Sequence, residues 1–305
     1  MRIIKNKDKS ENPTALTIGV FDGVHLGHQS LLKKLDSLAQ DESLLRTVVT
    51  FDVHPLSIVA PGHDPKMLLT LERRLELLEK TGLVDQVLVI TFDAVRAAQS
   101  AKDFISEVLV EQLNVKQILV GKNFQFGHER RGNVALLKDM GEQYGYSVSP
   151  VELLTNEALS PVSSTLIRQY ISVGNVEKAN ELLSRPHELK GIVVHGDKIG
   201  TDLGYPTANT QVNSGMCIPA DGVYGGHVVV DDKQYLSAIS IGVRPMFHED
   251  NIRVIEPHIL DFSGDIYGQE IKILFDRKIR DQLVLESKQA LIEQIGKDIM
   301  DVRTI

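Results

Sequence analysis

The sequence predicts an α/β unit with a parallel sheet, followed by a small antiparallel β-barrel and one C-terminal helix. Three observations support this prediction. In the first half, short apolar runs alternate with stretches of helical spacing, as strands and crossover helices do. From Gly191 onward the runs are short, rich in β-branched residues and separated by turn-forming residues. Near the end, Leu291, Ile295 and Ile299 recur at helical spacing, which indicates a helix that caps the barrel.

Length and composition set further limits. The chain has 305 residues, of which 42 % are hydrophobic and 24 % charged, so we expect two globular domains. No apolar run reaches the length of a membrane span or of a signal-peptide core, so we expect a cytoplasmic protein without membrane partners. The single cysteine, Cys217, fits a reducing compartment. The net charge of −8 argues against a nucleic-acid partner, and we expect a monomer or weak homo-oligomer.

The segment Gly19–His28 predicts a phosphate-binding turn. It follows Ala15–Val20, an apolar run of strand length, and precedes leucines at helical spacing. Glycines let this backbone approach a ligand, and a helix N-terminus offers N–H groups and a partial positive charge to an anion. A triphosphate therefore suits the turn. Its candidate nucleotide-binding residues are Gly19, Phe21, Asp22 and Gly23.

Two histidines in this segment narrow the chemistry. His25 and His28 flank a Leu–Gly step, so both could donate to phosphate oxygens at the helix start. The H-x-G-H pattern resembles the signature of the nucleotidyltransferase superfamily, in which an α-phosphate is attacked and pyrophosphate leaves. A surface or metal-binding coincidence is the alternative. Zinc usually requires further Cys or His at short spacing, and Cys217 is far away in the sequence.

The next elements continue the alternation of strands and helices. Asp52 and His54 follow one strand at its carboxyl end, where a parallel sheet meets its ligand, although loop polarity would also explain them. The predicted strands are 47–50, 86–91 and 117–120, and the predicted helices are 71–80 and 102–113.

An aromatic loop and a hydroxyl-rich segment follow. Phe124 and Phe126 alternate within a glycine-bounded loop, so one could offer its face to a planar ring; a hairpin tip or core packing is the alternative. Further on, hydroxyl groups stand at a helix start with an arginine one turn later. They could cap the helix, but we favour closure over the β- and γ-phosphates. The residues concerned are Ser163, Ser164, Thr165 and Arg168.

We place the domain boundary near Arg185–Pro186, which ends the helical stretch 176–183. The first domain is therefore predicted as 1–185 and the second as 186–305. Beyond the boundary, β-rich runs are separated by turns, as in a small barrel. The runs are 192–194, 223–230, 236–241, 254–260 and 270–275.

The second half contains its own candidate site. A glycine-rich stretch with Gly196, Lys198 and Gly200 is followed by Pro206–Asn209. Thr207 and Asn209 alternate onto one face of an extended segment, where they could hold Mg²⁺ and a phosphate oxygen. Glu256 lies in a largely apolar strand, so it is either paired structurally or acts as a base, and the residues alone slightly favour the structural role.

These motifs together make the chain resemble the bacterial bifunctional riboflavin kinase/FMN adenylyltransferases (FAD synthetases) along nearly its full length. The resemblance implies a Rossmann-like FMN adenylyltransferase domain over 1–185 and a riboflavin kinase domain over 186–305. It further implies that riboflavin, FMN and ATP are the substrates, that FMN and FAD are the products, and that Mg²⁺ serves both reactions.

The resemblance also implies roles for single residues. His25 and His28 would be catalytic in adenylylation, and Glu256 would be the base that deprotonates the ribityl 5′-hydroxyl, against the structural role favoured above. ATP and Mg²⁺ would lie on Gly196–Gly200 and Pro206–Asn209, with Thr207 and Asn209 as metal ligands. The implied flavin-binding residues are Asn123, Phe124, Phe126 and Arg280.

The chain departs from the family pattern in places. Asn123 and Gln125 stand where Asp and Arg are more frequent, and Tyr205 replaces a usual Phe. Arg244–Phe247 and Gln282 are further departures. Two other functions therefore compete with the bifunctional enzyme. One is a riboflavin kinase whose changed flavin loop has disabled adenylylation, and the other is a flavin-sensing regulator without turnover.

Overall fold

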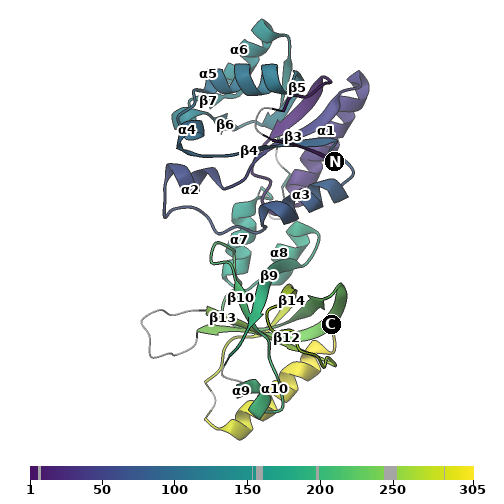
Figure 1. The fold of residues 1–305 in the computed structure, drawn as a ribbon, viewed down its shortest axis with the longest axis vertical. Coiled ribbons are helices and arrows are strands. Elements are labelled where there is room, and N and C mark those ends of the chain that lie inside the picture. The colour runs from purple at the N-terminus through teal and green to yellow at the C-terminus, as the bar shows by residue number, and fades with distance from the viewer. Residues whose placement is uncertain (6–7, 153, 156–160, 197–198, 244–252, 285) are drawn as a thin grey trace. The chain divides into compact units, whose positions relative to one another are not determined.

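The computed structural model describes residues 1–305 except 6–7, 153, 156–160, 197–198, 244–252 and 285 (Figure 1). The chain divides into two compact units, Met1–Ser163 and Ser164–Ile305. Each unit has its own sheet, so the predicted sequence of an α/β unit followed by a β-barrel is confirmed.

The first unit is built on a six-stranded parallel sheet. Its strand order is β1-β4-β3-β2-β5-β8, so the chain moves outward in both directions from β2. This order brings the carboxyl ends of β2 and β3 side by side beneath the predicted phosphate turn. The strands are β1 (Arg2–Lys5), β2 (Thr14–Ile18), β3 (Leu45–Phe51), β4 (Gln86–Ile90), β5 (Val115–Gly121) and β8 (Ser147–Val151).

Helices connect these strands and cover the sheet. Right-handed crossovers place α1 and α3 on one face and the helices after β4 and β5 on the other (Figure 1). The predicted helix 102–113 is a short α-helix continued by nine residues of π-helix, η1. The connecting elements are α1 (Leu26–Glu42), α2 (Pro55–Val59), α3 (Leu71–Lys80), α4 (Ala94–Ala97), α5 (Ala101–Asp103), η1 (Phe104–Gln112), β6 (Gln125–Phe126), η2 (His128–Arg130), β7 (Gly132–Asn133) and α6 (Val134–Tyr144).

The second unit is a closed antiparallel barrel with the strand order β10-β13-β12-β11-β14-β9. Along β13, Ile255, Pro257 and Ile259 are buried while the intervening side chains are partly exposed, as expected for one face that turns toward a core. The elements of this unit are α7 (Ser164–Ser172), α8 (Val176–Leu183), β9 (His187–Val194), α9 (Ile199–Asp202), β10 (Asn209–Val212), β11 (Gly222–Val230), β12 (Lys233–Val243), β13 (Arg253–Ile259), β14 (Glu270–Arg280) and α10 (Lys288–Val302).

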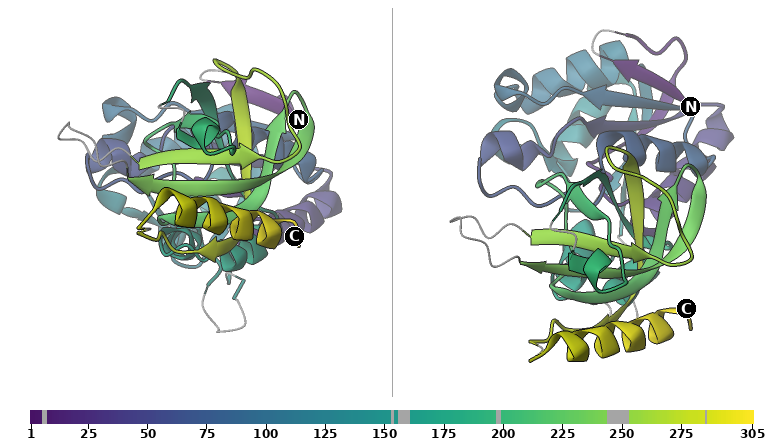
Figure 2. Two further views of the ribbon diagram at one scale, coloured as in Figure 1. Left: turned by 90° about the horizontal axis from the view of Figure 1, so that it is seen from below. Right: turned by 60° about the horizontal axis from the view of Figure 1, so that its bottom comes forward.

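The C-terminal helix α10 packs on β11, β12 and β14 of the barrel, as predicted (Figure 2). Arg280, the last residue of β14, donates two hydrogen bonds to the carboxylate of Asp298 at 2.8 and 2.7 Å. Because Asp298 is only 3 % exposed, this ion pair is largely shielded from water and fixes the helix against the strand. Arg277 donates to the carbonyl of Asp301 and adds a second attachment at the helix end.

Helices α7 and α8 pack against the same barrel. The Nδ2 of Asn180 donates to the carbonyls of Phe275 and Asp276, and its Oδ1 accepts from the N–H of His187 at 2.7 Å. Glu177 accepts from the N–H of Lys278. These bonds join α8 to the beginning of β9 and to β14, and α7 packs on α8, so α8 contributes directly to the stability of the second unit.

This packing makes the N-terminal limit of the second unit measurable. We expect the fragment Ser164–Ile305 to be more stable than the fragment Ser184–Ile305 by several kcal/mol, because the shorter fragment loses the buried face of α8, and one buried Val or Leu is worth about 1.5–3 kcal/mol. Denaturant unfolding of both fragments measures the difference. Equal midpoints would show instead that a boundary at 185/186 leaves the barrel complete.

A buried histidine gives the second unit a dependence on pH. His187 is 2 % exposed, and its Nε2 lies 2.9 Å from the carbonyl oxygen of Cys217. Burial lowers the pKa of His187 from 6.5 to about 4, and the hydrogen bond to Cys217 only partly opposes this effect. The imidazole is therefore neutral in the folded protein at neutral pH.

We expect this histidine to destabilise the second unit as the pH falls. Between the unfolded pKa and the lower folded pKa, the unfolded chain binds the proton and the folded chain does not, so stability is lost from about pH 6.5 toward pH 4. At pH 5 the loss is about 2 kcal/mol. Urea unfolding at several pH values measures it, and His187→Gln should flatten the profile. An unchanged pH profile in the variant would contradict this assignment.

Candidate active sites

The predicted phosphate turn lies between β2 and α1 and has an unusual backbone. Phe21, Gly23 and Val24 have φ values of 56°, 87° and 40°, so three of four successive residues lie in the left-handed region. His25 then caps α1, because its Nδ1 accepts the N–H of His28 at 3.3 Å. The turn therefore ends on a helix N-terminus, as the sequence predicts.

The two histidine rings lie on each other. The ring centroids of His25 and His28 are 3.6 Å apart in a stacked arrangement. The ring of Phe21 packs on that of His28 with the centroids 4.8 Å apart. Gly27 is required between them, because a Cβ there would lie 2.9 Å from the carbonyl oxygen of Val162 and 3.0 Å from the His25 ring. The structure thus brings both predicted catalytic histidines together at the helix start.

Other residues predicted around this site have contacts within the first unit. The Asp22 carboxylate is 1 % exposed and accepts the N–H groups of Leu68 and Leu69 at 3.0–3.1 Å. The Asp52 carboxylate accepts the N–H of Phe92 at 2.9 Å. Both carboxylates therefore hold loops at the carboxyl ends of the central strands β2 and β3. A contact of Asp22 with nucleotide stays a prediction.

The aromatic loop forms the small hairpin β6–β7. Phe124 and Phe126 stack with their centroids 5.4 Å apart, and Phe126 packs on Phe104 at 5.7 Å. Both rings are partly buried and pack against the core of the first unit, so the hairpin and core packing that the sequence left open as the alternative are present. Asn123 is exposed beside them. A flavin contact of these three loop residues stays a prediction.

The hydroxyl-rich segment falls at the division between the units. Ser163 is the last residue of the first unit, and Ser164, Thr165 and Arg168 lie in the first two turns of α7 in the second. Their predicted closure over the phosphates remains a prediction.

The second predicted site is assembled from two segments of the barrel. A Cβ at Gly196 would overlap the amide of Asn209, and a Cβ at Gly200 would lie 3.2 Å from Oγ1 of Thr207. The glycine-rich stretch and the Pro206–Asn209 segment are therefore in contact, as predicted. Lys198, predicted to bind nucleotide, lies outside the described residues.

Strand pairing brings Glu256 to the same place. Thr210 pairs with Ile255 in the antiparallel β10–β13 ladder, and Ala208 donates its N–H to Pro257, so Asn209 lies across from Glu256. Residues opposite each other in such a ladder project from the same face. Thus the predicted base and the predicted metal ligand share one face of the barrel.

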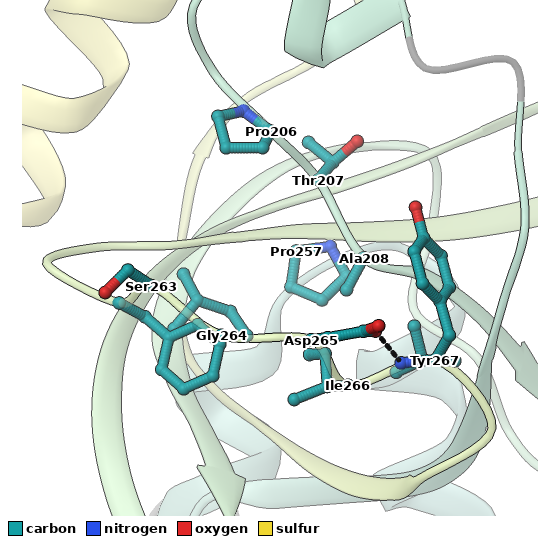
Figure 3. Close-up of a pocket in the computed structure, with 12 residues that line it drawn as sticks. Pro206, Thr207, Ala208, Pro257, Ser263, Gly264, Asp265, Ile266 and Tyr267 are labelled. Carbon is teal, nitrogen blue, oxygen red and sulfur yellow. Dashed lines mark hydrogen bonds between the residues drawn. The ribbon is translucent and has the colours of Figure 1, made fainter.

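A pocket of about 420 Å³ lies beside these residues (Figure 3). Thr207 and its neighbours line one side, and the segment 262–267 lines the other. The lining is mostly apolar, and the ring of Tyr267 also packs on His195 with centroids 4.0 Å apart. The sequence analysis missed Phe262 and Ile266 because an apolar loop residue has no distinguishing local signal. The lining residues are Val193, Pro206, Thr207, Ala208, Pro257, Ile259, Phe262, Ser263, Gly264, Asp265, Ile266 and Tyr267.

A second cavity of about 570 Å³ lies between α9 and the start of α10. Leu203, Leu283 and Leu291 supply its apolar lining, and Asp202 and Lys288 supply charges. Arg280, predicted to bind flavin, donates from Nε and Nη2 to Asp298 and from Nη1 to the carbonyl of Asp281 at 3.0 Å.

The departures from the family pattern fall partly on described residues. Tyr205 contacts His258 edge to face at 5.6 Å, and the Gln282 amide donates to the hydroxyl of Ser240 at 3.2 Å. Tyr205 therefore packs on β13, and Gln282 is hydrogen-bonded to β12. Arg244–Phe247 lie outside the described residues.

The donor groups of the second site fit a hard cation. Thr207 and Asn209 provide a hydroxyl and an amide oxygen, and Mg²⁺ prefers oxygen ligands and takes few of them from protein when phosphates supply the rest. Among the described residues, no three His, Cys, Asp or Glu are grouped as metal ligands. No helix in the described part of the chain is long and apolar enough to cross a membrane.

Comparison with known proteins decides the family. Residues 7–166 match the family model of FAD synthetase, and residues 183–305 match that of riboflavin kinase. The chain belongs to the bifunctional riboflavin kinase/FMN adenylyltransferases. It therefore combines the two domains of flavin cofactor synthesis in one polypeptide, which confirms the resemblance seen in the sequence.

Several members of the bifunctional family are similar along almost the whole chain. The protein of Escherichia coli K12 is 37 % identical over 290 residues, covering 94 % of this chain and 91 % of its own length. That of Bacillus subtilis 168 is 35 % identical over 289 residues, covering 93 % and 90 %. A crystal structure from Streptococcus pneumoniae, titled a macrolide-efflux protein, has a TM-score of 0.88 and 29 % identity and covers both chains completely.

The two glycine contacts predict separable defects. We expect Gly27→Ala to lower FAD formation at least tenfold, because the added methyl group would displace His25 or the carbonyl of Val162. We expect Gly196→Ala to lower FMN formation by as much, because it would displace Asn209. Chromatographic assay of FMN formed from riboflavin and, separately, of FAD formed from supplied FMN measures each rate in each variant. Equal losses of both activities in either variant would contradict two local effects.

Proposed function

We propose that the protein first phosphorylates riboflavin to FMN with ATP and then adenylylates FMN to FAD with release of pyrophosphate. The observation that carries this proposal is the placement of Asn209 across from Glu256, in contact with the backbone of Gly196. Membership of the bifunctional family and the stacked histidines of the first unit support the second reaction.

In the adenylylation step, a phosphate oxygen of FMN attacks the α-phosphorus of ATP, and the bond to the bridging oxygen of pyrophosphate breaks. His25 and His28 stand at the N-terminus of α1, where the partial positive charge of the helix end favours negative charge. We assign to His28 the stabilisation of charge that grows on the phosphates as pyrophosphate leaves. Catalysis here consists of positioning and charge neutralisation.

In the phosphorylation step, Glu256 accepts the proton of the riboflavin 5′-hydroxyl, whose oxygen attacks the γ-phosphorus while ADP leaves. Thr207 and Asn209 would hold Mg²⁺, which would neutralise charge on the phosphates. The backbone at Gly196 approaches Asn209 so closely that no Cβ would fit between them, so the Asn209 amide is held against the glycine-rich stretch.

The two cavities of the barrel suit the two ring systems of the substrates, the purine of ATP and the flavin. The pocket beside Thr207 has an apolar, partly aromatic lining that fits the purine of ATP. The leucine-lined cavity between α9 and α10 fits the dimethylbenzene side of the flavin ring.

We further propose that residues 1–185 carry adenylylation and residues 186–305 carry phosphorylation, with α7 and α8 of the first segment packed in the compact unit of the barrel. The protein acts in the cytoplasm as a monomer or weak homo-oligomer without nucleic acid. Incubation of purified protein with riboflavin, ATP and Mg²⁺ tests the function directly. FMN without FAD would favour the kinase alone, and neither product would favour a flavin sensor.

The proposed base gives a sharp prediction. Glu256→Gln keeps the size of the side chain and removes its charge, so we expect kcat for riboflavin phosphorylation to fall by about 10²–10⁴, the range for a positioned general base. Binding of ATP should persist through Thr207 and Asn209. Steady-state kinetics with riboflavin measure the effect, and a rate within about threefold of the parent would leave Glu256 only a structural role.

The reciprocal variant serves as the matched control. His28→Ala should lower FAD formation from supplied FMN by about 10²–10³, the typical effect of losing one donor to a developing charge, and leave FMN formation unchanged. Conversely, Glu256→Gln should leave adenylylation of supplied FMN nearly unchanged. Parallel losses in both reactions, together with loss of cooperative unfolding, would point to misfolding.

A further inference from the structure

A buried arginine lies directly beneath the first site. Arg74, in the first turn of α3, is 0 % exposed. Its Nη1 donates to the carbonyl of Val20 at 2.6 Å, and its Nη2 donates to the carbonyl of Phe51. Burial lowers the pKa of Arg74, but a guanidinium stays protonated in proteins. The protein therefore keeps a full positive charge inside the first unit.

The two accepting carbonyls mark the carboxyl ends of neighbouring strands. Val20 follows β2 and precedes Phe21, where the left-handed turn begins, and Phe51 ends β3 just before Asp52. One guanidinium thus joins the two strand ends on which a ligand of a parallel sheet lies. Thr50 adds a second donor to the same Val20 carbonyl, from its hydroxyl at 3.0 Å.

The same turn is fixed to α3 from the other direction. The Asp22 carboxylate accepts the N–H groups of Leu68 and Leu69, which directly precede α3. Its charge and that of Asp52 also favour the cationic form of Arg74 through space. The turn and the beginning of α3 therefore hold each other through two sets of buried charged hydrogen bonds, which are stronger than neutral ones.

We propose that Arg74 is a positioning residue of the adenylyltransferase site, because its guanidinium fixes the main chain from which the turn carrying His25 and His28 begins. The residue acts through the Val20 carbonyl and touches no substrate. Loss of the guanidinium lets the left-handed turn relax, since such backbone is costly and persists only where its surroundings impose it. A displacement of about 1 Å at reacting groups can cost about 10² in rate.

The test compares variants in the full-length enzyme, with the riboflavin kinase reaction as an internal control. We expect Arg74→Met to lower kcat for FAD formation by about 10², with a smaller change in KM for ATP, and to leave FMN formation within twofold. Arg74→Lys keeps the charge and one donor, so it should recover part of this loss. Thr50→Val, an isosteric change, should lower FAD formation several-fold.

Arg46→Met is the matched control for lost stability. Arg46 is a partly buried arginine of β3, and it pairs with Asp36 and Asp85 at the amino end of that strand. Its removal should change FAD formation less than threefold below the unfolding transition. An equal loss in Arg46→Met, or FAD formation within threefold in folded Arg74→Met, would overturn the proposal.

Two outcomes keep the test decisive. Where Arg74→Met does not fold, Arg74→Lys and Thr50→Val decide, and unchanged kcat in both overturns the proposal. The proposal rests on adenylyl transfer at His28, so His28→Ala is assayed alongside. If His28→Ala retains full FAD formation, the proposed site itself fails, whereas a defect in His28→Ala with none in the Arg74 variants refutes the role of Arg74 alone.

Discussion

Both candidate sites depend on a main chain that approaches a functional side chain more closely than any Cβ would allow. At Gly27 the neighbours are the His25 ring and a carbonyl group, and at Gly196 the neighbour is the Asn209 amide. A glycine at such a point lets backbone N–H groups and polar side chains converge on a phosphate. The geometry of each site is therefore set before any ligand binds, which is how positioning catalysis works.

Each unit also fixes a helix through a charged group that is removed from water. In the first unit Arg74 joins α3 to two strand ends, and in the second Asp298 joins α10 to Arg280. A buried charge without partners would be strongly destabilising, so these groups tolerate few alternative arrangements of their neighbours. Because each buried charge must keep its hydrogen-bond partners, the helix and the strand ends that it joins are held in one arrangement.

The two units suit the two chemistries. Adenylyl transfer needs donors where charge develops on leaving pyrophosphate, and under the proposed mechanism the N-terminus of α1 with its stacked histidines would supply them without a base. Phosphorylation of a hydroxyl needs a proton acceptor in addition, and Glu256 on the outer face of the barrel is placed next to the oxygen donors that would hold the cation. FMN links the units chemically, as the product of one reaction and the substrate of the other.

The sequence by itself determined the fold class, most element positions and the motif residues. Helix α3 begins and ends as predicted from its periodicity, and the Gly19–His28 turn has the expected strand before it and helix after it. These features follow from local patterns, because capping, periodicity and glycine spacing act within one or two turns of chain. The edge strands β1 and β8 and the barrel strand β10 were missed because their short segments have only weak patterns.

Only the tertiary structure decided which of these residues meet. Arg73 and Arg74 look alike in the sequence, yet Arg73 pairs with Glu76 along its own helix while Arg74 is buried beneath the phosphate turn. The sequence left open whether Phe124 and Phe126 pack against the core, and it did not show that Asn209 lies across from Glu256. Such contacts join segments far apart in the chain, and they depend on strand register and on packing between elements, which no local pattern contains.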